Sequence, residues 1–165
     1  MNENYIVING KRPELTEEQL KALGIETKRK NPFEKVTTGD VYYTINYYGD
    51  ISEYMQYKFW ADEALFERCN YFNDESFAKQ VAFHQLLYRK LLKFAYDNGC
   101  EDYKEWKKCN EHWCVYYDHV NEIFSTMCRY ATKHFDIYFS TREGAERAIK
   151  EVVEPFMKEH PDFVW

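Results

Sequence analysis

Several features that identify common classes of protein are missing from this 165-residue sequence. Its six glycines stand singly, so it has no glycine-rich loop to cradle a phosphate. No apolar run approaches the length of a membrane span, and no basic-then-apolar leader opens the chain, so we expect a soluble, cytoplasmic protein with no membrane partner. Basic residues are not in excess either, since the formal net charge is −6. Binding of nucleic acid needs a basic surface, so we expect no direct binding of nucleic acid.

Motifs for catalysis and metal binding are also missing. There is no nucleophile-elbow serine and no metal-binding helix with paired histidines, so we predict that the protein is not an enzyme. Five scattered cysteines, an odd number, indicate reduced thiols instead of a disulfide framework. Cys109, His112 and Cys114 have the residue types of a metal site, but their spacing does not fit a zinc knuckle. We predict no metal and no cofactor, and whether these three side chains ever bind metal stays open.

Aromatic residues, in contrast, are abundant, with 15 Tyr, 12 Phe and 4 Trp. Between Val41 and Tyr48, apolar and aromatic residues recur with the period of two that is typical of a strand. Gly49-Asp50 is a turn signal, and Ile51 to Tyr57 returns with the same period, so the sequence predicts a β-hairpin. A polar, acidic connection is predicted from Ala61 to Asn70.

A long amphipathic helix is predicted from Asp74 to Asn98, with His84 on its apolar stripe as a hydrogen-bonded histidine of the core. The second half of the chain repeats this order of hairpin and helix. Its predicted elements are strands at Trp113–Val120, Ile123–Tyr130 and Phe135–Ser140, and a helix over Arg142–Val153 that Thr141 caps and Pro155 ends.

One short pattern occurs twice. "YFNDESFAKQ" begins at Tyr71 and "YFSTREGAER" begins at Tyr138, 67 residues later. Each is an aromatic pair, a polar break and an alanine near the start of a helix. We therefore predict an α+β fold of two sheet-plus-helix units, about 41–98 and 112–155, that share one core and arose by internal duplication.

The two units are expected to form a single domain over residues 31–165. Residues 1–30 are predicted to be an N-terminal arm with a short strand and a short helix, which Thr16 begins and Gly24 ends. Such a helix is too short to be stable alone, so it must dock on the rest of the chain or on a partner. Which of the two it does stays open.

Charge and aromatic residues coincide in the first unit. The segment from Asp50 to Glu75 holds seven acidic and two basic residues, and in the hairpin Asp50 and Glu53 lie among tyrosines. Aromatic anchors carry much of the energy of protein interfaces, while carboxylates at the rim chiefly set the association rate. We therefore predict a protein-binding surface made of Tyr48, Asp50, Glu53, Tyr54, Asp62, Glu63 and Glu67.

Several stretches resemble a family of small proteins carried by phages and prophages of gut bacteria. They include "LTEEQLKALGIE", "YFNDESFAKQVAFHQLLYRKLLKFAYDNG" and "IYFSTREGAERAIKEVVEPFMKEHPDFVW". The resemblance covers nearly the whole chain and contains no active-site motif. By analogy it implies a phage inhibitor of bacterial defence in the host cytoplasm, such as an anti-CRISPR protein that binds a CRISPR effector and blocks its nucleic-acid binding or activation. The alternatives are a phage structural or DNA-packaging accessory protein and a small enzyme, and the oligomeric state stays open.

Overall fold

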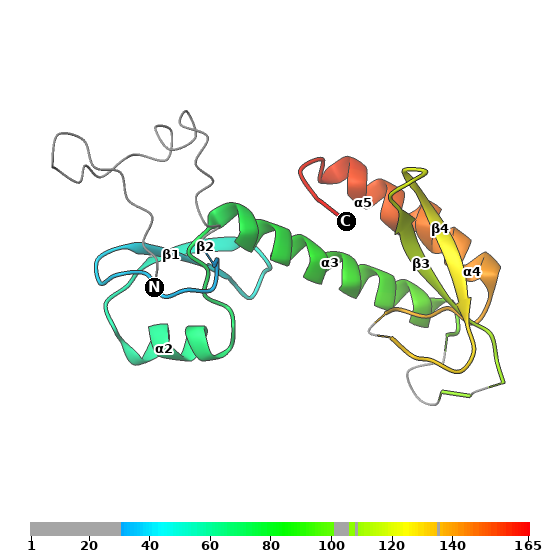
Figure 1. The fold of residues 1–165 in the computed structure, drawn as a ribbon, viewed down its shortest axis with the longest axis horizontal. Coiled ribbons are helices and arrows are strands. Elements are labelled where there is room, and N and C mark those ends of the chain that lie inside the picture. The colour runs from blue at the N-terminus through cyan, green and yellow to red at the C-terminus, as the bar shows by residue number, and fades with distance from the viewer. Residues whose placement is uncertain (1–30, 101–105, 108, 135) are drawn as a thin grey trace, which may run out of the picture.

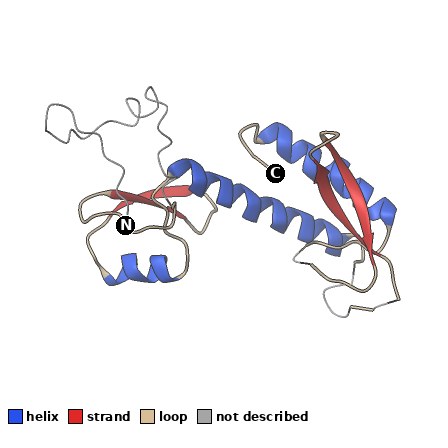
Figure 2. Cartoon of the chain, in the orientation of Figure 1, coloured by secondary structure: helices blue, strands red, loops and turns tan. Residues whose placement is uncertain are grey.

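The computed structural model describes residues 31–100, 106–107, 109–134 and 136–165, so the predicted N-terminal arm lies outside the described residues. Two small units lie at the two ends of one long helix, α3 (Glu75–Asp97), which connects them (Figure 1). Each unit contains a two-stranded antiparallel sheet, drawn red in Figure 2. The predicted α+β class is confirmed.

The first unit begins with the predicted hairpin. Strands β1 (Val41–Ile45) and β2 (Ile51–Met55) pair antiparallel, with Tyr43 opposite Glu53. On the other side of β1, Tyr43 exchanges two backbone hydrogen bonds with Phe72, at N–O distances of 2.7 and 2.9 Å. The hairpin is thereby extended by a one-residue bridge that leads directly into α3.

The connection between β2 and this bridge differs from the prediction. An irregular acidic segment is expected there, but the structure has a helix, α2 (Trp60–Glu67). Asp62 and Glu63 lie in its first turn, where the helix dipole favours negative charge. Its Phe66 packs edge-on against Tyr71, with ring centroids 5.6 Å apart. Asp62 and Glu63, which suggest a loop in the sequence, therefore lie at the start of a helix.

Helix α3 forms where the sequence predicts it. The Asp74 side chain accepts a 2.9 Å hydrogen bond from the Phe77 backbone N–H, which satisfies one of the free donors at the helix start. Gly99, at φ +79, follows the last turn and takes a conformation that favours glycine. The 23 residues of the helix span about 35 Å, and they contact β1 and β2 at one end and the second unit at the other.

The second unit contains the second predicted hairpin, β3 (His112–Asp118) and β4 (Ile123–Arg129). The predicted third strand is reduced to one bridge, in which Phe139 exchanges two backbone hydrogen bonds with Trp113. A continuous helical segment follows. It consists of α4 (Arg142–Ala148), the π-helical turn η1 (Ile149–Val153) and α5 (Glu154–Glu159).

Pro155 is predicted to end this helical segment, and that prediction is wrong. The chain stays helical to Glu159, with Pro155 in the first turn of α5. A proline inside an α-helix conflicts with the carbonyl four residues earlier. The wider turn of η1 ends at Val153, one residue short of Pro155, and shifts the hydrogen-bond pattern by one residue, which removes that conflict.

The buried residues do not form the single shared core that the sequence predicts. One cluster joins Leu87 and Leu91 of α3 to the second unit, including Phe156. The buried tyrosines of the first unit, Tyr42 and Tyr71, stack on each other with ring centroids 4.1 Å apart and are not part of that cluster. Because α3 is so long, its two ends pack in two separate places.

The two repeated aromatic pairs have matching surroundings. Tyr71, Phe72, Tyr138 and Phe139 are all at most 2 % exposed. Each tyrosine hydroxyl accepts a hydrogen bond from the backbone N–H of an earlier residue, and each phenylalanine bridges the first strand of its hairpin. A capped helix begins shortly after each pair. These local equivalences fit the predicted duplication, which itself stays a prediction.

Candidate protein-binding surface

The seven residues predicted to contact a partner do not lie on one surface. Tyr48, 75 % exposed, and Asp50 are on the turn of the first hairpin, next to α3. Glu53 and Tyr54 are both exposed, but as neighbours in a strand they point to opposite faces of β2. Glu67 is exposed at the far end of α2. These residues are therefore spread around the first unit.

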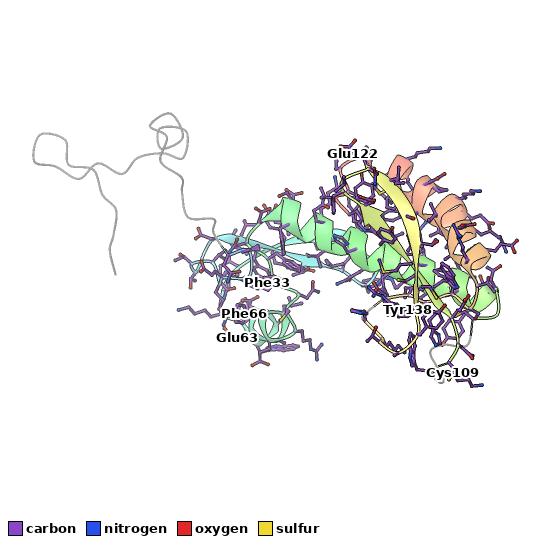
Figure 3. The ribbon with its side chains drawn as sticks, turned by 45° about the vertical axis from the view of Figure 1, so that its right-hand side comes forward. Phe33, Glu63, Phe66, Cys109, Glu122 and Tyr138 are labelled. Carbon is purple, nitrogen blue, oxygen red and sulfur yellow. The ribbon has the colours of Figure 1, made fainter. Side chains whose placement is uncertain are left out.

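Asp62 and Glu63 differ from the other five. Asp62 is only 6 % exposed, so it is not available to a partner. Glu63 is partly buried and forms an ion pair with Lys35, whose ammonium group also lies 4.4 Å from the centroid of the Phe66 ring. Figure 3 shows Glu63 and Phe66 together on α2. This pair fastens α2 to the segment before β1.

A group of exposed apolar side chains lies at the end of β2 and the start of α2. Met55, Tyr57, Phe59 and Trp60 are 45, 53, 63 and 83 % exposed. The Tyr57 hydroxyl lies 2.6 Å from the Met55 sulfur, and the rings of Tyr57 and Phe59 have centroids 5.8 Å apart. Trp60 follows directly as the first residue of α2. We call these four residues the aromatic surface.

The buried carboxylate of Asp62 holds the backbone of the aromatic surface in place. One of its oxygens accepts hydrogen bonds from the backbone N–H groups of Tyr57 and Phe59, at 3.1 and 3.0 Å. The other accepts the Tyr42 hydroxyl at 2.8 Å, which ties the loop to the centre of β1. Between the two bonded amides, Lys58 has φ +60, a left-handed conformation that is rare for a residue with a side chain. The loop is therefore fixed, and its strain is offset by these bonds.

The protonation states in this network follow from the same contacts. Burial alone would raise the pKa of Asp62, but the hydrogen bonds from Tyr42, Phe59 and Tyr57 outweigh it, and the pKa is lowered from its ordinary value. Burial and the neighbouring Asp62 carboxylate together raise the pKa of Tyr42. At neutral pH the carboxylate is therefore charged and accepts, and the hydroxyl is neutral and donates.

A cavity of about 370 Å³ lies at the other end of the hairpin, between its turn and α3. Tyr48 and Asp50 from the predicted set form part of its wall, and Arg89, Lys79 and Glu75 come from α3. Acidic and basic side chains are mixed in this cavity. Its lining therefore does not select a ligand of one charge.

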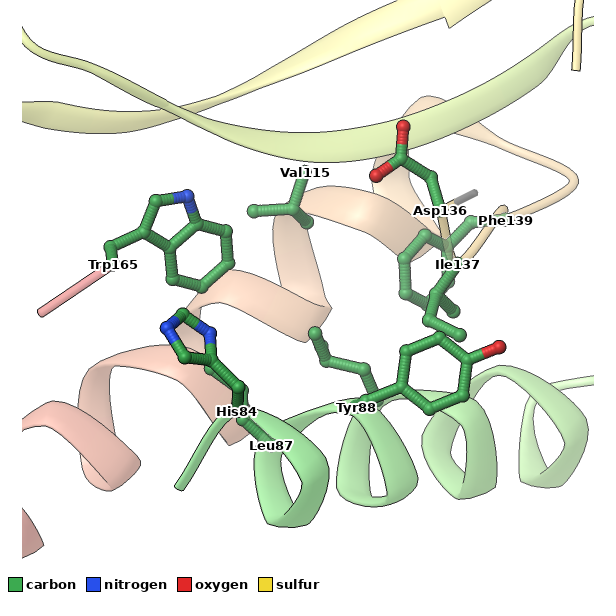
Figure 4. Close-up of a pocket in the computed structure, with 9 residues that line it drawn as sticks. His84, Leu87, Tyr88, Val115, Asp136, Ile137, Phe139 and Trp165 are labelled. Atoms are coloured by element: carbon green, nitrogen blue, oxygen red, sulfur yellow. The ribbon is translucent and has the colours of Figure 1, made fainter. Parts of the chain in front are cut away.

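A second hollow, a groove of about 220 Å³, lies between α3 and β3 (Figure 4). Its floor is apolar, and Asp136, Trp165 and His84 lie at its edge. His84 is predicted to be a core residue, but it is exposed and packs edge-on against Phe163 at 4.7 Å. The partial burial of its ring lowers the pKa of His84, so the imidazole is neutral at neutral pH. The prediction fails because the groove interrupts the packing at this point of the apolar stripe.

Cys109, His112 and Cys114 have three different environments in the structure. His112 is fully buried, stacks on Trp106 at 3.6 Å and lies 2.9 Å from the Lys107 carbonyl oxygen. Cys114 is buried, and burial raises the pKa of its thiol to about 11, which makes it a poor nucleophile. Cys109 is exposed. Among the described residues, no three His, Cys, Asp or Glu side chains are placed to hold one metal ion.

Tyr57, Phe59 and Trp60 are not among the residues that the sequence predicts to contact a partner. Their segment, "MQYKFWADE", combines bulky side chains with acids three residues further on, which is a signal for an exposed helix start. The alternation of residues along the predicted strand places Tyr57 on one face of β2. In the structure β2 ends at Met55, so this alternation does not decide where the Tyr57 side chain lies. Reading the acids as a helix start would have placed the aromatic residues at its exposed tip.

Comparison with protein-family models, with curated proteins and with solved structures found no match. Over the residues that the structure describes, no helix combines the length and the apolar character needed to cross a membrane.

Proposed function

We propose that this protein acts by binding another protein through the aromatic surface, and that it is not a catalyst. The observation that carries the proposal is that the buried carboxylate of Asp62 fixes the backbone of Tyr57 and Phe59, with the exposed Trp60 directly after them. Clustered exposed apolar side chains can mark a site of protein–protein interaction. A buried charge that holds such a group outward fits a site prepared for binding.

The energetics favour this use of the aromatic residues. Trp60 is 83 % exposed, and covering its side chain would remove on the order of 150 Å² from water, or about 4 kcal/mol before the costs of association. Tryptophan and tyrosine are also the residues that most often dominate interface energy. Because the loop is already ordered, binding loses little additional conformational entropy there.

The exposed acids of the first unit indicate the character of the partner. Glu53 and Glu67 are exposed acids of the same unit, and Glu63 is partly exposed. A partner with an apolar pocket and a basic rim would match this arrangement, and rim charges of this kind increase the association rate at low salt. A nuclease complex that binds nucleic acid offers such a basic surface.

The sequence resemblance supports a more specific form of the proposal. In this form the protein is a phage-encoded inhibitor that occupies the basic nucleic-acid channel of a bacterial defence nuclease, such as a CRISPR effector, in the host cytoplasm. The exposed acids of the first unit would take the place of phosphates, and the aromatic surface would supply the affinity.

Site-specific crosslinking tests the general proposal without knowledge of the partner. A photo-reactive phenylalanine analogue is placed at Trp60 or, as a matched control, at Tyr47, which is 86 % exposed at the opposite end of the hairpin. After irradiation in host cells we expect a discrete crosslinked protein from position 60 and none from position 47. Crosslinks from 47 alone, or none from 60, would refute the role of the aromatic surface.

A cleavage assay tests the specific form. Purified CRISPR effector, guide RNA and target DNA are combined with the wild-type protein, with the Phe59→Ala/Trp60→Ala variant or with Tyr47→Ala. We expect inhibition by the wild type and by Tyr47→Ala, and loss of inhibition with the double variant. If the wild type inhibits none of the effectors of its host, the inhibitor form is wrong, while the crosslinking result still decides the binding proposal.

A further inference from the structure

Both hairpins have an open edge. Because Tyr43 uses its backbone N–H and C=O to bond Phe72, the strand partner opposite it, Glu53, directs its own N–H and C=O away from β1. The same reasoning holds in the second unit. Trp113 uses its backbone N–H and C=O to bond Phe139, so Cys128, which lies opposite Trp113, directs its own N–H and C=O away from β3. The outward-directed residues of β4 are therefore Phe124, Thr126 and Cys128. Within the described residues, β4 pairs with β3 alone.

The two edges differ in how they are protected against pairing with other strands. The edge of β2 is five residues long and has the carboxylate of Glu53 at its centre. A charge in that position is a common device against edge-to-edge association. The edge of β4 is seven residues long and has no charge and no proline between Ile123 and Cys128. Of the two edges, only that of β2 therefore carries such a protecting charge.

We propose that the β4 edge is the interface of a homodimer, in which β4 of a second copy pairs with it antiparallel about a two-fold axis at Thr126. This inference is independent of the proposed function. In this register Thr126 pairs with Thr126 of the second copy, and Phe124 pairs with Cys128 of the second copy. These are the residues whose N–H and C=O groups point outward, so about six backbone hydrogen bonds form and the two sheets become one of four strands.

The side chains are compatible with this register. Thr126 lies beside another threonine, and Phe124 beside a cysteine, with no like charges opposed. Arg129 falls opposite Ile123 of the second copy, next to its Glu122. Glu122 lies at the tip of the hairpin, where Figure 3 labels it, and neither residue has an ion pair among the described residues. Each end of the paired strands thus has a positive group within one residue of a negative group of the second copy.

The test is the mass of the full chain in solution, measured by sedimentation or light scattering over a wide range of protein concentration. We expect a dimer at high concentration. Thr126→Pro removes an N–H that β3 does not use, so it should leave the hairpin intact and raise the dimer Kd at least roughly tenfold. Glu53→Pro is the matched control, because its N–H also points to an open edge, and it should leave the Kd unchanged.

A second set of variants guards against loss of folding in Thr126→Pro. Arg129→Glu should weaken the dimer, and the double variant with Glu122→Arg should restore it. A chain that is monomeric at every concentration overturns the proposal, as does a dimer that Glu53→Pro disrupts and Thr126→Pro does not. A monomer whose Thr126 amide is protected from hydrogen exchange would show that another segment of the same chain covers the edge, and it would overturn the proposal as well.

Discussion

Replacing Asp62 by asparagine tests whether this carboxylate holds the aromatic surface. Asparagine has nearly the same volume and keeps one acceptor oxygen. If that oxygen keeps the Tyr42 hydroxyl, the new NH₂ group faces the backbone N–H groups of Tyr57 and Phe59, which are also donors. The two charge-assisted hydrogen bonds are therefore lost, and the two backbone N–H groups face the asparagine NH₂ group without an acceptor.

The expected cost follows from these contacts. A hydrogen bond to a charged group contributes about 1.5–3 kcal/mol, and the two bonds share one carboxylate oxygen, so we expect a loss of about 2–3 kcal/mol in the free energy of unfolding. The matched control is Glu67→Gln, which removes one negative charge from an exposed position of the same helix. A surface change of that kind should cost less than about 0.5 kcal/mol.

The measurement is hydrogen exchange at the amides of Tyr57 and Phe59, together with urea unfolding. A loss of 2–3 kcal/mol corresponds to exchange about 30- to 150-fold faster at these two positions. If Asp62→Asn changes neither the exchange nor the stability more than Glu67→Gln does, Asp62 does not hold the loop, and the support for the aromatic surface as a prepared site is lost.

The pH dependence gives a second test of the same residue. The pKa of Asp62 is lower in the folded protein than its ordinary value of 3.8. Its contribution to stability is therefore fully present above that value and is lost as the pH falls through the lowered folded pKa. We expect the stability of Asp62→Asn to fall less steeply than that of the wild type below about pH 4. Parallel curves for the two proteins would contradict the assigned direction of the pKa shift.

Further variants test the packing of the two units. Phe156→Ala, at a position 1 % exposed in the second unit, should lower the free energy of unfolding by about 3–5 kcal/mol in urea titrations. Tyr71→Phe removes a hydroxyl that accepts the Val36 N–H and donates to Gln56, so it should cost about 1–2 kcal/mol by the same measurement. Pro155→Ala should change the stability by less than about 1 kcal/mol, because the wide turn before it already accommodates a residue without an N–H.

Local signals in the sequence were sufficient for most elements of the fold. The period of two at Val41–Ile45, the amphipathic pattern from Asp74 and the alanine that follows each aromatic pair all predicted what the structure shows. What failed depended on longer-range packing. The separation of the cores follows from the length of α3, and the exposure of His84 follows from a groove that β3 and Trp165 help to form. No local pattern contains that information.

The candidate site shows the same limit. Of the predicted residues, Tyr48, Glu53 and Tyr54, which belong to the predicted hairpin, are exposed. Asp62 is not, because its burial depends on Tyr42, a residue twenty positions earlier that the hairpin brings to it. In the structure this carboxylate therefore supports the aromatic surface from inside the protein and is not itself exposed on it.

The difference between the two units explains why the aromatic surface lies in the first. In both, a hairpin is bridged by a phenylalanine that leads into a capped helix. Only in the first does a described helix, α2, lie between the second strand and that bridge. The start of this helix needs acceptors for its free N–H groups, and Asp62 supplies one at the position where Tyr57, Phe59 and Trp60 are exposed.

In the second unit the corresponding connection is short, and the strands β3 and β4 are longer. The exposed feature there is the edge of β4, which has no charge from Ile123 to Cys128. One arrangement of hairpin and helix thus presents two different surfaces, side chains in the first unit and backbone in the second, and each of them calls for its own binding experiment.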